Sequence, residues 1–115
     1  MKVITPGHNY VLDSFEGNNP QTIQFIEKEP ISKDKHPEYW EDGKTPADST
    51  LHTVSDGTTN EAVLEMLINR MQFLQSKMAC RENAIVITKL EESLMWLNKR
   101  TNDRKKRGVE GKHQA

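Results

Sequence analysis

The stretch that decides the fold is residues 58–78, TTNEAVLEMLINRMQFLQSKM. Its apolar side chains recur at alternating steps of three and four residues, the spacing of one face of an α-helix. The residues on this stripe are Leu64, Leu67, Met71, Leu74 and Met78. Thr58 and Glu61 have the spacing of a capping box. The stretch therefore predicts an amphipathic helix that begins near Thr59 and runs to about Lys77.

A second apolar stripe of the same kind follows a short break at residues 78–81. Its members are Ile87, Leu90, Leu94 and Leu97. The helical pattern continues to Arg104, and Gly108 is the predicted C-terminal cap. Because only a few residues separate the two stripes, the sequence predicts an antiparallel helical hairpin over residues 58–108.

The residues before the hairpin contain short segments with strand propensity, separated by turn residues. These segments are residues 3–5, 8–15, 21–28 and 51–54. Pro30 is predicted to end the third segment, and residues 30–50, rich in proline and charge, are predicted to form a surface excursion. Residues 109–115 lack periodicity and are predicted to be a mobile tail. The expected fold class is α+β: a small N-terminal antiparallel sheet, within residues 1–57, followed by a C-terminal antiparallel helical hairpin, in one domain of residues 1–115.

The composition limits what kind of site one chain can build. Only 34% of the 115 residues are hydrophobic, which is too few for a large core around a deep cavity, so we expect self-association to supply further burial. The net charge is −1, but residues 99–115 contain seven basic and two acidic residues. This cationic end favours an anionic partner or a solubilising role. The chain has no long apolar run and no signal-peptide pattern, so we expect a soluble, intracellular protein.

Catalytic and metal-binding patterns are weak in this sequence. Glu91 and Glu92 are adjacent, so on a helix their side chains diverge by about 100° and do not form a facing carboxylate pair. Cys80 has no histidine near it in sequence, and we expect an inert thiol. The four histidines and the single cysteine do not have metal-ligand spacing. We therefore expect no enzymatic activity, no metal and no cofactor.

Anion binding is the chemistry that the sequence favours. Arg100, Arg104 and Arg107 follow one another at steps of four and three, so their side chains project from one helix face. Each guanidinium can give a phosphate two charge-assisted hydrogen bonds, each worth about 1.5–3 kcal/mol. The alternative is that these residues only complement the helix dipole and keep the chain soluble.

Three further residues could contact a nucleotide. Phe73 lies off the apolar stripe between two glutamines, and its ring could stack on a base or pack under the sheet or in a subunit interface. Trp96 lies beside the second stripe, and we expect it in the core or in an interface. Asn83, in the first turn of the second helix, is either a residue of the cap region or a hydrogen-bonding group for a ligand.

Four segments carry a resemblance to a known family. Residues 56–64, DGTTNEAVL, and residues 80–97, which contain RENA and LEESLMWL, resemble the phage-encoded Thoeris anti-defence protein one family. Residues 1–12, MKVITPGHNYVL, and residues 107–113, RGVEGKH, are similar to members of it as well. The resemblance spans nearly the whole chain except residues 30–50. The stretch from RENA to MWL is shared with related phage sponges that sequester cyclic oligonucleotides of the CBASS system.

The resemblance implies a sponge without enzymatic turnover. Members of the family bind glycocyclic ADP-ribose, the signal that bacterial TIR-domain proteins make on infection, so that the downstream NAD-depleting effector stays off. They combine a small antiparallel sheet with a helical hairpin and form ligand pockets between paired subunits. For this chain the resemblance implies a homodimer or a higher oligomer such as a hexamer, in the cytoplasm of the infected bacterial host, with CBASS cyclic oligonucleotides as further ligands.

The ligand-binding residues that the resemblance implies are Phe73, Asn83, Arg100 and Arg104. An arginine that relatives carry in the preceding strand region has no counterpart here, since residues 40–56 contain no arginine. Two other functional classes stay open. One is a small phage nucleic-acid-binding regulator that uses the basic C-terminal helix, whose binding would fall steeply with salt. The other is an interaction protein whose basic end only solubilises it. We expect neither nucleic acid nor a membrane as the partner.

Overall fold

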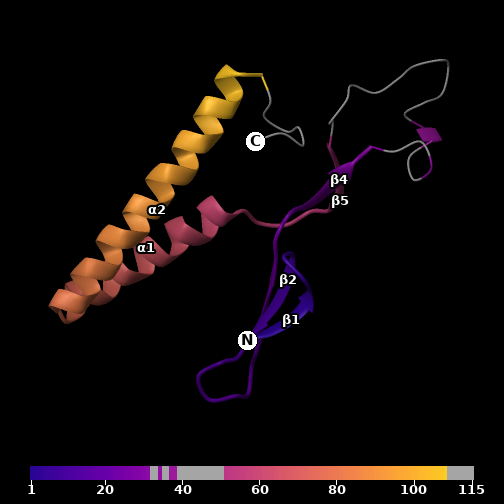
Figure 1. The fold of residues 1–115 in the computed structure, drawn as a ribbon. Helices are drawn as coiled ribbons and strands as arrows, with labels where there is room; N and C mark the ends of the chain where they lie inside the picture. Colours follow the sequence, from indigo (N-terminus) through magenta and orange to yellow (C-terminus); the bar gives the residue numbers. More distant parts are fainter. Residues whose placement is uncertain (32–33, 35–36, 39–50, 109–115) are drawn as a thin grey trace. The chain divides into compact units, whose positions relative to one another are not determined.

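The structure is a computed structural model that describes residues 1–31, 34, 37–38 and 51–108. The chain forms two compact units, with residues 1–58 in the first and residues 59–108 in the second (Figure 1). The first unit consists of antiparallel strands and the second of two helices, as the predicted α+β class requires. Most of the predicted excursion at 30–50 and the whole predicted tail at 109–115 lie outside the described residues.

The first sheet has three strands in the order β1-β2-β3. They are β1 (Lys2–Thr5), β2 (Asn9–Leu12) and β3 (Gln21–Gln24), and both pairings are antiparallel. Gly7, with a φ of 79°, allows the tight turn between β1 and β2 because the left-handed region costs glycine little. Tyr10 on β2 packs edge to face against Phe25, with ring centroids 5.9 Å apart.

The second sheet pairs β4 (Glu27–Pro30) with β5 (Leu51–Ser55). The prediction of one strand over residues 21–28 was therefore wrong, because this segment divides between two sheets. Phe25 and Ile26 leave the ladder with β2, and Phe25 forms a parallel bridge with Thr58 instead. Pro30 was predicted to follow the strand and end it. It is instead the last residue of β4, where a missing N–H is tolerated.

The segment after β5 is held against the end of β3 by backbone hydrogen bonds. The Thr58 N–H donates to the Gln24 carbonyl at 2.8 Å, and the Ile26 N–H donates to the Thr58 carbonyl at 2.9 Å. A Cβ atom at Gly57 would collide with the backbone of Gln24 and Phe25. Glycine is therefore required at position 57 for this close approach.

The first helix, α1 (Asn60–Lys77), begins one residue later than the predicted capping box implies. Thr59 is the N-cap, and its side-chain hydroxyl accepts a hydrogen bond from the Ala62 N–H at 3.1 Å. The assignment of the cap to Thr58 was wrong because the backbone of Thr58 is already bonded to the strand unit.

The second helix, α2 (Arg81–Lys106), packs against α1 as the predicted antiparallel hairpin (Figure 1). The predicted stripe of α2 is half-buried at all four positions. On α1 the half-buried apolar residues are Val63, Leu64, Ile68, Met71 and Leu74. Met78 is 79% exposed and does not belong to the stripe, because the chain leaves the helical conformation there. Gly108, with a φ of 70°, follows α2 as predicted.

No hydrophobic side chain among the described residues is fully buried. The helices contact each other through half-buried side chains, while large apolar residues such as Met66, Phe73, Met95 and Trp96 stay more than half exposed. The expected shortage of core within one chain is therefore present in the described residues. Neither of the two described helices is long and apolar enough to cross a membrane.

Candidate functional site

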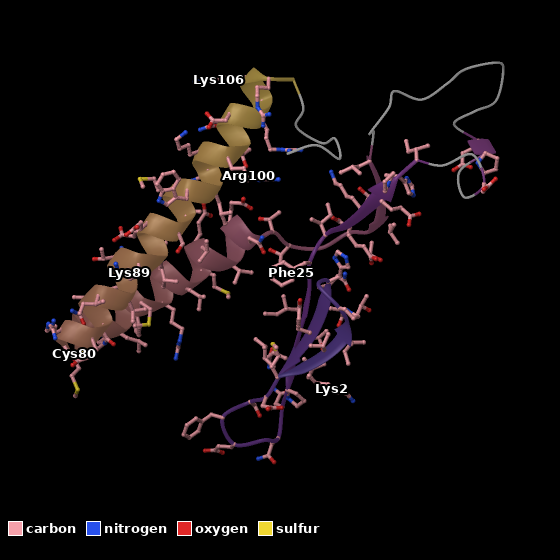
Figure 2. The ribbon with its side chains drawn as sticks, in the orientation of Figure 1. Lys2, Phe25, Cys80, Lys89, Arg100 and Lys106 are labelled. Atoms are coloured by element: carbon pink, nitrogen blue, oxygen red, sulfur yellow. The ribbon has the colours of Figure 1, made fainter. Side chains whose placement is uncertain are left out.

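The basic end of α2 carries the predicted arginine face. Arg100 and Arg104 lie in its last two turns and Arg107 is its C-cap, and Figure 2 shows Arg100 in the half of α2 that ends at Lys106. The spacing of four and three places the three side chains on one face. Their environments differ, because Arg100 is exposed whereas Arg104 is only 6% exposed and is the one buried charged residue among those described. Arg100 is therefore more accessible from solvent than Arg104.

Phe73 and Asn83 lie at the other end of the hairpin, beside the turn between the helices. Phe73 is 58% exposed, and Lys77 Nζ lies 5.3 Å from its ring centroid in a cation–π contact. Asn83 is half-buried in the first turn of α2, where its backbone N–H donates to Cys80 Sγ at 3.4 Å. Phe73 is therefore exposed on the surface of the hairpin, as its position between two glutamines predicted. Asn83 lies near the turn.

The turn itself is held by one glutamine side chain. Gln75 Oε1 accepts from the Cys80 N–H at 3.0 Å, while Gln75 Nε2 donates to the Cys80 carbonyl at 3.0 Å. Cys80 is exposed and acts as the N-cap of α2, since its Sγ takes the place that a hydroxyl oxygen usually has. These contacts give Cys80 a structural role in setting where α2 begins.

The structure does not bring the four predicted residues together within one chain. Asn83 and Arg100 are both on α2, and seventeen helical residues span about 26 Å at a rise of about 1.5 Å each. Phe73 is close to the turn as well, being four residues before the end of α1. One hairpin thus presents an aromatic–amide pair at one end and an arginine pair at the other.

The arginine end also contains an ion pair. Lys99 Nζ lies 2.9 Å from Asp103 Oδ2, one helical turn away. The hydrogen bond from Lys99, together with its positive charge, lowers the pKa of the Asp103 carboxyl below its usual value. Lys99 therefore already has an anionic partner, whereas Arg100 makes no ion pair with any residue that the structure describes.

Two of the hollows on the hairpin lie near its basic end or between its helices. The larger is an open groove of about 1030 Å³ that contains none of the four predicted residues. Its polar lining includes four carboxamide side chains, Asn69, Gln72, Asn98 and Asn102. The smaller hollow, about 250 Å³, is lined by Trp96, Lys99, Arg100, Asp103 and Arg107.

Trp96 was expected in the core or in an interface, and the structure contradicts the first option. Its side chain is 58% exposed and lines the small hollow beside Arg100. Its position one helical turn before Arg100 was available from the sequence as a step of four residues, but it was outweighed by the usual burial of tryptophan. Within the described residues no group of three potential metal-binding side chains is close enough together to hold an ion.

Comparison with known proteins gives a match over the second half of the chain. The family model described as Acb2/Tad1, hairpin domain, matches residues 42–102, which is just over half of the 115 residues. The match includes β5, the whole of α1 and α2 as far as Asn102. It therefore covers Phe73, Asn83 and Arg100 and ends just before Arg104.

A curated relative is similar over a segment of the same length. Thoeris anti-defense 1 from Bacillus phage SBSphiJ7 is 57% identical to this chain over 61 residues. These residues make up 52% of this chain and 43% of the relative. The matched segment therefore spans less than half the length of that relative.

Proposed function

Because the chain belongs to the Acb2/Tad1 hairpin-domain family, we propose that it is a phage anti-defence protein that binds a nucleotide signal and holds it without chemical change. The proposed ligand is glycocyclic ADP-ribose made by bacterial TIR-domain proteins, and the proposed result is a block of Thoeris immunity. The name of the similar phage protein, Thoeris anti-defense 1, supports this role. The proposed place of action is the cytoplasm of the infected bacterial host.

The observation that carries the ligand class is the arginine face of α2. Arg100 and Arg104 are four residues apart, and the exposed Arg100 has no ion-pair partner among the described residues. A guanidinium in this state can form two parallel hydrogen bonds with a phosphate, which a lysine cannot. An ADP-ribose-type signal has the two phosphates that such a face would hold.

The complete pocket is proposed to form between two chains. One hairpin separates Phe73 from Arg100 by most of its length, so a ligand the size of a nucleotide cannot touch both within one chain. In a two-fold dimer with antiparallel hairpins, the turn end of one subunit would lie beside the arginine end of its partner. Two equal pockets would result, each with Phe73 and Asn83 from one subunit and Arg100 and Arg104 from the other.

Binding without turnover is tested by calorimetry on the full chain with glycocyclic ADP-ribose. To remove a signal from a receptor the sponge needs nanomolar affinity, about −12 kcal/mol, and a slow off-rate. Heating the complex should then release the ligand with unchanged mass in mass spectrometry. Absence of heat at micromolar protein would refute the proposed ligand, and a ligand of changed mass would identify an enzyme.

The shared pocket is tested by mixing two defective variants. Phe73→Ala and Arg100→Ala should each weaken binding at both pockets of a homodimer. After unfolding and refolding together, about half of the dimers should be mixed, each with one intact pocket, so about a quarter of all pockets should bind as in the unaltered protein. Recovery of no sites in a mixture that sedimentation shows to be dimeric would place the pocket within one chain.

A further inference from the structure

The hairpin has only two aromatic side chains, Phe73 and Trp96. Phe73 lies near the turn between the helices, whereas Trp96 lies near the arginines of α2. Trp96 is one helical turn before Arg100, so both side chains project from the same face of α2. Trp96 is 58% exposed although tryptophan is among the side chains that proteins bury most. The indole and the Arg100 side chain line the same hollow of about 250 Å³.

The charged residues that line this hollow include an ion pair and an exposed arginine. The carboxylate of Asp103 is paired with Lys99 at 2.9 Å. Arg100 lines the same hollow as this pair and makes no ion pair with any residue that the structure describes, so its positive charge is available to an anionic ligand. An aromatic ring beside cationic groups on a surface is the combination that binds a base through its face and a phosphate through its oxygens.

We propose that Trp96 is a further ligand-binding residue, whose indole stacks on the purine base of a nucleotide while Arg100 of the same helix holds its phosphate. This inference rests on the proposed function and adds a residue to the same site. The hollow is too small for a whole dinucleotide-like ligand and fits one end of it. The arginine end would therefore contact the base as well as the phosphate, and the Phe73 end of the other subunit would complete the pocket.

The test uses the fluorescence of Trp96 as a direct reporter. The chain has two tryptophans, so Trp40→Phe leaves Trp96 as the only one. Titration of this variant with glycocyclic ADP-ribose should quench its fluorescence with the same midpoint that calorimetry gives. Calorimetric heat without any change in fluorescence would overturn the role of Trp96, whereas absence of heat would reject the proposed function itself.

Substitution separates stacking from a merely structural role. Trp96→Leu should weaken binding by about 5- to 150-fold, the value of one base–aromatic stack, and Trp96→Phe should recover most of the loss. Met95→Ala removes an equally exposed apolar side chain from the neighbouring position and should leave the affinity unchanged. Sedimentation velocity should give the same assembly for all variants. Equal affinity of Trp96→Leu and the unaltered chain, or loss of assembly in Trp96→Leu, would overturn the inference.

Discussion

The two ends of the helical hairpin are stabilised by different interactions. At the turn, side chains form hydrogen bonds with the backbone. The Gln75 carboxamide bonds to both the N–H and the carbonyl of Cys80, and the Cys80 side chain caps α2. At the other end, charged side chains act on one another along α2, with Lys99 and Asp103 paired beside Arg100. The turn end is thus fixed in geometry, whereas the arginine end is rich in charge. In the proposed dimer, each pocket would combine the turn end of one subunit with the arginine end of its partner.

The largest expected effect comes from removing charge at the arginine end. Arg100→Ala should weaken binding of glycocyclic ADP-ribose by about 10- to 150-fold, because a charge-assisted contact is worth about 1.5–3 kcal/mol. Arg100 is a better choice than Arg104, whose buried side chain could also affect folding. Calorimetry at constant salt measures the effect.

The matched control for this prediction is Lys106→Ala. Lys106 also lies in the last turn of α2 but lines the larger groove rather than the hollow beside Arg100. Its loss should change affinity by no more than about twofold, since exposed charges are screened by salt. Equal losses in the two variants would mean that the arginine end attracts anions only through its net charge.

Local patterns predicted the hairpin well, because the apolar residues that pack between the helices recur at regular steps within each helical segment. The half-buried positions Ile87, Leu90, Leu94 and Leu97 were all identified from their steps of three and four. The strand unit was predicted less accurately, since its pairing depends on distant residues. Nothing between residues 21 and 28 indicates that β3 pairs with β2 while β4 pairs with β5, which is more than twenty residues away.

The sequence predicted four site residues, but it did not show how they are arranged in space or which other side chains lie beside them. The sequence identified Arg100 as part of a basic face, and the structure places it beside an exposed Trp96 that was expected to be buried or in an interface. Burial depends on what packs against a helix, which helical spacing alone does not specify. The ligand-binding roles of Phe73, Asn83, Arg100 and Arg104 stay predictions.

An intermediate effect is expected from loosening the turn end. Gln75→Ala removes two hydrogen bonds to Cys80, each worth about 0.5–1.5 kcal/mol, and should lower the free energy of unfolding by about 1–2 kcal/mol. Amide hydrogen exchange at Cys80 should speed up more than exchange elsewhere in α2, because its N–H loses its acceptor. Urea unfolding at fixed protein concentration gives the stability change.

Gln72→Ala is the control for the turn. It removes the same side chain one turn earlier on α1, where the carboxamide lines the larger groove and makes no hydrogen bond with the residues described. Exchange at Cys80 should then stay as in the unaltered chain. If both variants lose equal stability, the turn end is held by helix packing and the contrast between the two ends disappears.

The smallest effect concerns the carboxylate within the charged end. Asp103→Asn removes the one acidic group that lines the hollow with Arg100 and frees Lys99, so affinity for an anionic ligand should rise by about two- to fivefold at pH 7. Lys99 lowers the pKa of Asp103, so at pH 4 a larger share of this carboxylate is charged than of one with an ordinary pKa of about 3.9. The affinity ratio of the variant to the unaltered chain should therefore fall less between pH 7 and pH 4 than it would for a carboxylate with the ordinary pKa. Any stability from the Lys99 pair is likewise present above the ordinary pKa and disappears only as the pH falls through the lowered value.

The control for this prediction is Glu92→Gln, which removes an acidic group about two turns before Arg100 and should leave the affinity unchanged at both pH values. A ratio that falls at pH 4 as far as an ordinary carboxylate would give would mean that Lys99 does not lower the pKa of Asp103, and that the arginine end lacks the ion pair that distinguishes it from the turn.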